Sequence, residues 1–152
     1  MSKKLISIIF MYILLTGCDT VIDGIVGPDY DCEECYLEIS APDLVVDENG
    51  FYTMTYNNTD YQTFSTLKAE TGSTSEYQYL AWTSNKEFGV EWQGQMIWTN
   101  LVNGSSYTDG NGEAFTVLGV YSNFIGDTIK VYCGYEDNEN IHYLDSLEVI
   151  VK

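Results

Sequence analysis

The sequence predicts an all-β domain over residues 36–152, and three observations lead to that fold class. Short apolar or alternating runs recur along this part of the chain, and clusters of Asx and glycine residues separate them. No segment shows a sustained 3.6-residue period of the kind that marks a helix. The 13 tyrosines and 3 tryptophans favour strands over helices. Strands at this spacing are typical of an antiparallel β-sandwich or barrel.

Nine runs are predicted as strands. They are residues 36–40, 44–46, 51–56, 63–69, 77–83, 89–98, 114–121, 128–133 and 141–151. The last run has the clearest period of two, because Leu147, Val149 and Val151 share one face while Ser146 and Glu148 share the other. Turn-forming clusters between the runs lie at residues 47–50, 57–60, 108–112 and 135–140.

The first 17 residues have the composition of a secretory signal peptide. Lys3 and Lys4 form a short positive region, and an apolar region follows over residues 5–15, in which Ser7 is the only clearly polar residue. A membrane-spanning helix needs about 20 apolar residues, so this stretch is too short to span. We expect it to be cleaved, which leaves the mature protein without a transmembrane helix.

The apolar region ends in Leu15-Thr16-Gly17-Cys18, which resembles the lipobox of bacterial lipoproteins. The resemblance implies that Cys18 is lipidated with fatty acyl chains such as palmitate and becomes the first residue of the mature protein. An ordinary secretory signal is the alternative, but no Ala-x-Ala site follows. Two or three acyl chains anchor a protein stably, where a single chain binds only marginally.

We therefore expect a lipid-anchored protein of the cell envelope. The composition has no arginine and is rich in Asn, Tyr and Ile, which indicates an AT-rich genome. On that ground the outer membrane is favoured over the inner membrane.

Residues 18–35 are predicted to be a tether, because glycine, proline and acidic residues replace any sustained period. Once Cys18 is lipidated, Cys32, Cys35 and Cys133 remain, an odd number for an oxidising compartment. Two glutamates between Cys32 and Cys35 should raise the thiol pKa values, whereas a redox cysteine needs its pKa lowered. A zinc site would need more cysteine or histidine ligands. We expect a disulfide within this pair or from one of its members to Cys133.

The mature chain is strongly acidic. Loss of the two lysines in the signal peptide leaves four lysines against 23 acidic residues, a formal net charge of −19. Four lysines are too few to neutralise phosphates, so nucleic acid is excluded as a partner. Anionic lipid headgroups are excluded for the same reason, so the acyl chains are the expected membrane contact of a monomeric protein.

Residues 107–114, Tyr-Thr-Asp-Gly-Asn-Gly-Glu-Ala, are followed by apolar alternation, by Gly126 and by two final strands. The first strand, residues 37–42, precedes Val-Asp-Glu-Asn-Gly at residues 46–50. This pattern resembles bacterial immunoglobulin-like domains of the invasin and intimin group, in which a Thr-Asp-x-x-Gly-x-Ala turn precedes a strand. The resemblance implies an immunoglobulin-like antiparallel β-sandwich with a structural or adhesive role. Residues 57–76 and the three tryptophans do not follow the pattern.

No catalytic constellation stands out, and we expect a protein that is not an enzyme. Glycosidases need two carboxylates with opposed pKa values, and no such pair is distinguished among the 23 acidic residues. A Ser-His-Asp triad would have to use the only histidine, His142, which lies inside the last predicted strand. The chain has neither a phosphate-binding loop nor a Gly-x-Ser-x-Gly elbow.

Calcium is the one cofactor with candidate ligands, because acidic and amide side chains gather in two turns. The candidates are Asp109, Asn111 and Glu113 in the first turn and Glu136, Asp137 and Glu139 in the second. The first turn departs from the EF-hand pattern, since Ala114 and Val120 stand at its sixth and twelfth positions. Solvated acidic turns without a cofactor are the simpler interpretation.

Trp82, Trp92 and Trp98 could form a platform for stacking sugars, because tryptophan has an apolar face with a polar edge. The even spacing of Trp92 and Trp98 predicts one face of a continuous strand, unless Gly94-Gln95 interrupts it. The simpler interpretation of such aromatics is a core position. Two roles remain open: a non-enzymatic binding, adhesion or envelope-structural protein with an unidentified surface protein or glycan ligand, and a carbohydrate-binding accessory lipoprotein.

Overall fold

The structure is a computed structural model that describes residues 36–74, 77–137 and 140–152. The signal peptide, the tether and the predicted sites Cys18, Cys32, Cys35 and Glu139 lie outside the described residues. In the part of the chain that is described, no helix is long and apolar enough to cross a membrane.

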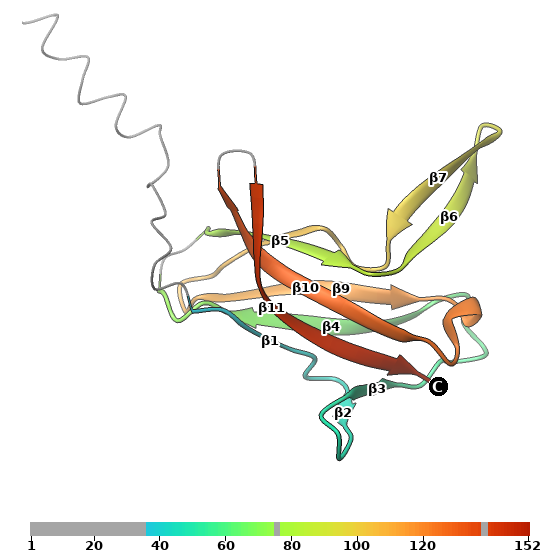
Figure 1. Ribbon diagram of the computed structural model, residues 1–152, viewed down its shortest axis with the longest axis horizontal. Coiled ribbons are helices and arrows are strands. Elements are labelled where there is room, and N and C mark those ends of the chain that lie inside the picture. The colour runs from blue at the N-terminus through green and yellow to red at the C-terminus, as the bar shows by residue number, and fades with distance from the viewer. Residues whose placement is uncertain (1–35, 75–76, 138–139) are drawn as a thin grey trace, which may run out of the picture. The chain divides into compact units, whose positions relative to one another are not determined.

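The described residues form strands joined by turns, with one short 3₁₀ helix, which confirms the all-β fold class (Figure 1). The strands are β1 (Glu38–Ser40), β2 (Val45–Val46), β3 (Tyr52–Met54), β4 (Thr63–Glu70), β5 (Tyr79–Ser84), β6 (Glu87–Trp92), β7 (Gln95–Asn100), β8 (Ser105–Tyr107), β9 (Glu113–Val120), β10 (Thr128–Asp137) and β11 (Asn140–Val151), with the helix η1 (Ser122–Phe124) between β9 and β10.

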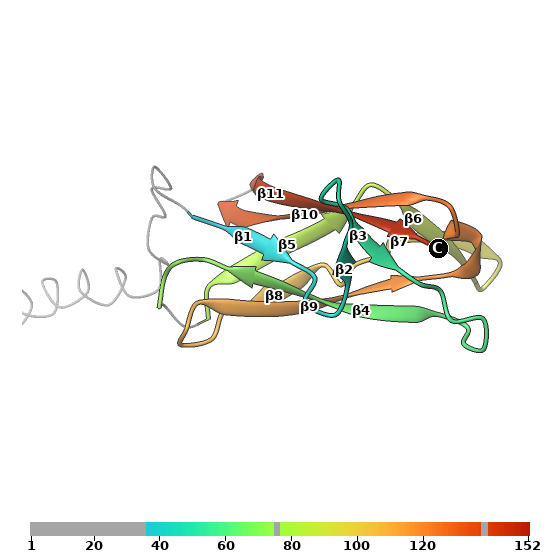
Figure 2. The same cartoon turned by 90° about the horizontal axis from the view of Figure 1, so that it is seen from below.

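The strands pair into three sheets. One has the order β1-β4-β9, a second has the order β2-β3-β11-β10-β5-β8, and β6 and β7 form a third by themselves. The pairings are antiparallel except that of β3 with β11, which is parallel. Figure 2 shows the two larger sheets as two layers, with β10 and β11 in one and β4 and β9 in the other.

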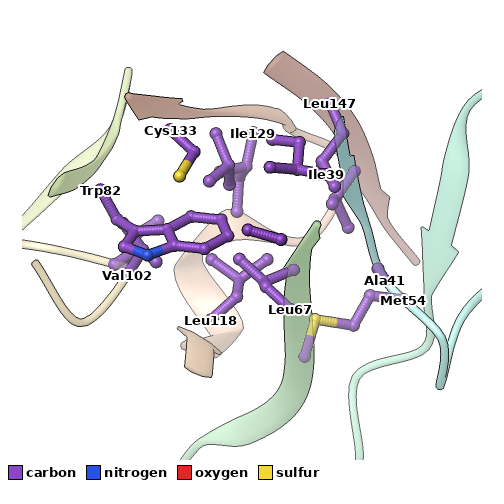
Figure 3. Close-up of a cluster of buried hydrophobic side chains, with 14 of the residues drawn as sticks. Ile39, Ala41, Met54, Leu67, Trp82, Val102, Leu118, Ile129, Cys133 and Leu147 are labelled. Carbon is purple, nitrogen blue, oxygen red and sulfur yellow. The ribbon is translucent and has the colours of Figure 1, made fainter. Parts of the chain in front are cut away.

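The core lies between these two sheets, because alternate side chains of each turn toward the other. In β11, Leu147, Val149 and Val151 are buried, as the period of two predicted. Figure 3 shows Ile129 and Leu147 of the larger sheet facing Leu67 and Leu118 of the smaller one, with the Trp82 indole lying across this space. Removing this apolar surface from water is the main favourable contribution to the fold.

The predicted continuous strand over residues 89–98 is wrong. The chain reverses at Gln93 and Gly94, whose φ angles are 52° and 79°. Two successive residues with positive φ are the signature of a type I′ turn, whose twist matches that of a hairpin. The result is the β6–β7 hairpin, with Trp92 paired to Gln95 across the turn.

Two smaller differences concern turns. The cluster at residues 135–140, predicted to be a turn, is largely strand, since β10 continues to Asp137 and β11 starts at Asn140. Strand β8 was not predicted, because its two serines carry no apolar signal; it forms by pairing with β5. Each of the other eight predicted runs overlaps an observed strand.

Candidate functional site

Polar groups at the base of the β6–β7 hairpin, which we call its root, join the hairpin to the rest of the domain. The Asn100 side-chain oxygen accepts hydrogen bonds from the Thr83 hydroxyl at 3.1 Å and from the Ser84 backbone N–H at 3.3 Å. The Ser84 hydroxyl donates to the Lys86 carbonyl at 2.7 Å and accepts from the Leu101 N–H at 3.2 Å. These bonds hold both ends of the hairpin, which projects from the two larger sheets (Figure 1).

The register of the hairpin determines which side chains share a face. Gly89 pairs with Trp98 and Trp92 pairs with Gln95. Paired residues share a face, and residues three apart along one strand lie on opposite faces. Trp92 and Trp98 therefore lie on opposite faces, and the prediction that they share one is wrong.

Each face carries its own apolar group. Phe88, Val90, Trp92 and Ile97 lie on one face, and Met96 and Trp98 lie on the other with Gly89 and Glu91. A side chain at Gly89 would bring its Cβ to 2.6 Å from the Met96 sulfur, so the glycine leaves room for Met96 and Trp98 to lie over the strand.

The hairpin exposes these side chains to solvent. Trp92 is 62% exposed and Trp98 is 64% exposed, and Val90, Met96 and Ile97 are exposed as well. Neither outer edge of the hairpin pairs with another described strand. A lone two-stranded hairpin is at best marginally stable in water, and exposed apolar patches mark interaction sites. This hairpin is therefore the strongest candidate binding element.

Trp82 does not join the other two tryptophans. It is 3% exposed, and its indole N–H donates to the Ser106 hydroxyl at 2.8 Å within the core. The structure thus brings none of the three predicted platform residues onto a shared surface, and Trp82 has the core position that is usual for aromatic residues.

Two grooves flank the root of the hairpin. One, of about 740 Å³, lies on the side of η1 and is lined by Tyr56, Asp60, Tyr61, Phe88, Gly89, Val90, Glu91, Tyr121, Ser122 and Asn123. The other, of about 540 Å³, is lined by Trp98 together with Phe64, Val117 and other residues of β4, β7 and β9. Phe88 and Tyr121 line both, and their ring centroids lie 4.4 Å apart.

No feature of the sequence indicated that the aromatic residues of the 740 Å³ groove would lie together. Tyr61, Phe88 and Tyr121 belong to a loop, a strand and a turn that are far apart along the chain. Only the pairing of β4 with β9 and the direction in which the hairpin leaves β5 bring them together.

Cys133 lies among the core side chains with 0% exposure (Figure 3), and it forms no disulfide with another described residue. Burial raises the pKa of this thiol to about 12. Its predicted partners, Cys32 and Cys35, lie outside the described residues, so the disulfide hypothesis remains a prediction.

The first predicted calcium turn is held by its own hydrogen bonds. The Asp109 carboxylate accepts the backbone N–H groups of Asn111 at 2.8 Å and Glu113 at 3.0 Å, and these bonds lower its pKa. The Glu113 carboxylate lies 2.7 Å from the Lys68 ammonium. Across residues 36–74, 77–137 and 140–152, no three His, Cys, Asp or Glu side chains gather as a metal site.

The structure describes only part of the second predicted calcium-binding turn. Glu136 is exposed in β10, whereas the side chain of Asp137 and all of Glu139 lie outside the description. His142, the residue that a triad would require, is exposed in β11.

No protein-family model matches the chain, and no curated protein matches it in sequence.

Proposed function

We propose that this chain is a lipid-anchored envelope protein, without enzymatic activity, whose immunoglobulin-like domain binds a protein partner through the β6–β7 hairpin. The observation that carries the proposal is the exposure of Val90, Trp92, Met96, Ile97 and Trp98 on a projecting two-stranded hairpin. Tryptophan is enriched among the residues that contribute most to protein–protein binding.

The strand order supports an immunoglobulin-like sandwich. Such domains place strands A, B and E in one sheet and C, F and G in the other. Strands β1, β4 and β9 pair as A, B and E do, and β5, β10 and β11 pair as C, F and G do. In this correspondence the hairpin is inserted directly after strand C.

The lipobox and the charge support the anchoring part of the proposal. Acyl chains on Cys18 would hold the protein at the membrane, and the acidic domain would be repelled from anionic headgroups. A tether would give the hairpin freedom to reach a partner beyond the lipid surface.

The opposite orientations of Trp92 and Trp98 favour a protein over a glycan as the ligand. A saccharide that stacks on one face of the hairpin reaches only one of the two indoles. A protein groove can enclose both faces, and a partner strand can pair with the N–H and C=O groups along either free edge.

Photo-crosslinking in the native host tests the hairpin. Benzoylphenylalanine at position 92 or 98 should form adducts with one protein, whereas the same probe at Tyr107, an exposed aromatic position on β8, should not. Adducts at all three positions or at none would contradict the proposal. A glycan adduct from position 98 alone would favour the carbohydrate-binding alternative, since Trp98 also lines the 540 Å³ groove.

Fractionation tests the anchor. Cys18→Ala should move the protein from the membrane fraction to the soluble fraction, because no thiol would remain at the lipobox to accept lipid. A variant that stays in the membrane fraction after a carbonate wash would contradict lipidation at this residue.

A further inference from the structure

The groove of about 740 Å³ beside the hairpin root has a wall of aromatic rings. The Phe88 and Tyr121 ring centroids are 4.4 Å apart, and the Tyr61 and Tyr121 centroids are 5.4 Å apart with the ring planes at 80°. Tyr61 is 86% exposed, so its ring stands at the rim. All three rings line the groove and are inclined to one another, and the face of an aromatic ring carries negative electrostatic potential.

The described lining of the groove includes two acidic residues and no cationic one. Asp60 and Glu91 line it, and among the described residues no lysine or histidine does. Three of the described lysines have partners elsewhere: Lys68 with Glu70 and Glu113, Lys86 with Asp127, and Lys130 with Glu148. The groove therefore has negative charge that the domain itself does not neutralise.

The loop that presents Asp60 and Tyr61 is held in place without a ligand. The Tyr56 hydroxyl donates to the Asp60 carbonyl at 2.8 Å, and it also lies 3.1 Å from the Tyr61 carbonyl. The Asn57 amide donates to the Asp60 carboxylate at 2.6 Å. A wall that is already ordered loses little conformational freedom when a ligand enters.

We propose that this groove binds a lysine or arginine side chain of the protein that docks on the hairpin, with Tyr61, Phe88 and Tyr121 contacting the cation and Asp60 and Glu91 neutralising it. The inference rests on the proposed function, because the hairpin brings the partner to the groove, and it adds the chemistry that the partner must present. Cations bind over aromatic faces within about 6 Å of the ring centroid. Acidic surroundings also raise the local concentration of a basic ligand.

The test uses the mature lipidated chain in neutral detergent micelles and two short peptides. One is acetyl-Gly-Lys-Gly-amide, and the other is the same peptide with an acetylated lysine side chain, which has no charge. Binding is followed by NMR of ¹³C-labelled tyrosine and phenylalanine rings. The cationic peptide should shift the Tyr61, Phe88 and Tyr121 signals saturably, and the acetylated peptide should not.

Charge-matched variants assign the site. Glu91→Gln and Tyr61→Ala should each weaken binding of the cationic peptide by about threefold or more, the size of one exposed cation–π or ion-pair contact. Glu87→Gln is the control, because it removes the same charge from the same strand outside the groove. Equal weakening by Glu87→Gln and Glu91→Gln would reduce the effect to net charge and overturn the proposal. Equal binding of the two peptides, or no binding of either, would overturn it as well.

The two proposals fail in different ways. A Trp92→Ser/Trp98→Ser variant that carries the benzoylphenylalanine probe at the exposed hairpin position 97 should lose the crosslinked partner and keep peptide binding, because none of these three residues lines this groove. Crosslinking that survives while the peptide shifts are absent would leave the hairpin proposal in place and reject the groove.

Discussion

Among single residues, Cys133 has the most constrained chemistry. Its thiol is fully buried and has no disulfide partner among the described residues, and burial raises its pKa to about 12, so the thiolate that reacts with alkylating agents is scarce in the folded protein. We expect iodoacetamide at pH 8 to modify Cys133 at least about 100-fold more slowly in the native protein than in urea. Peptide mass spectrometry measures this site alone, and comparable rates in the two states would contradict the buried position.

The raised pKa of the Cys133 thiol predicts that the free energy of unfolding falls as the pH rises in the alkaline range. The unfolded thiol ionises near pH 8.5, whereas the folded thiol stays neutral until a pKa of about 12. The unfolded state alone therefore gains ionisation as pH rises from about 8.5, and stability falls over that interval. Cys133→Ala should lessen this dependence in urea titrations at pH 8 and pH 10. An unchanged slope would show that other groups cause it.

Position 134 requires glycine, because the backbones of β10 and β11 approach each other closely there. The β10–β11 register shifts between Cys133 and Gly134, and a Cβ at Gly134 would come 1.9 Å from the His142 carbonyl oxygen. Gly134→Ala should therefore cost about 3 kcal/mol in the free energy of unfolding. In Gly104→Ala the new Cβ meets only the Trp82 carbonyl, at 3.8 Å, so this control should cost less than about 1 kcal/mol. Similar costs in chemical denaturation would contradict the tight bulge.

At the scale of elements, the type I′ turn of the hairpin places Gln93 in the left-handed region that asparagine adopts more readily. Gln93→Asn should stabilise the hairpin by about 0.5–1 kcal/mol and slow amide exchange in β6 and β7. Exchange in β10 and β11 should not change, because the hairpin lies outside the core. Faster exchange in the hairpin would contradict the assigned turn.

Strand β11, which has one buried face, was predictable from the alternation in its sequence, whereas the β6–β7 hairpin, which has two exposed faces, was not. In β11, Leu147 and Val149 alternate with polar residues because one face meets the core. In β6 and β7, apolar residues lie on both faces, so no alternation marks either strand, and Gln93-Gly94 is a weaker turn signal than Asn-Gly.

The candidate site was predictable only in part. Trp92 and Trp98 were singled out by residue type, but their faces depend on a turn that the pattern did not reveal. Trp82 was grouped with them because residue type alone does not separate a core indole from an exposed one. Tyr61 and Tyr121 meet through tertiary contacts, for which a single sequence carries no local signal.

For the whole molecule, the dominant electrostatic property is self-repulsion. The formal net charge is −17, and the described ion pairs involve only Lys68, Lys86 and Lys130. Raising NaCl from about 10 mM to about 150 mM shortens the Debye length from about 30 Å to about 8 Å. We expect Tm to rise by roughly 4 °C as the repulsion is screened. A fall in Tm on calorimetry would mean that the ion pairs outweigh the repulsion.

The parallel pairing of β3 with β11 has a consequence for the order in which the protein is made. Val149 pairs with Tyr52 and Val151 pairs with Met54, and the Lys152 N–H donates to the Met54 carbonyl at 2.9 Å. One edge of β3 can therefore pair only after residues about a hundred positions later in the sequence have been synthesised. Until Val151 has been synthesised, β3 has only β2 as a paired strand, and an unpaired strand edge of this kind favours aggregation of the incomplete chain.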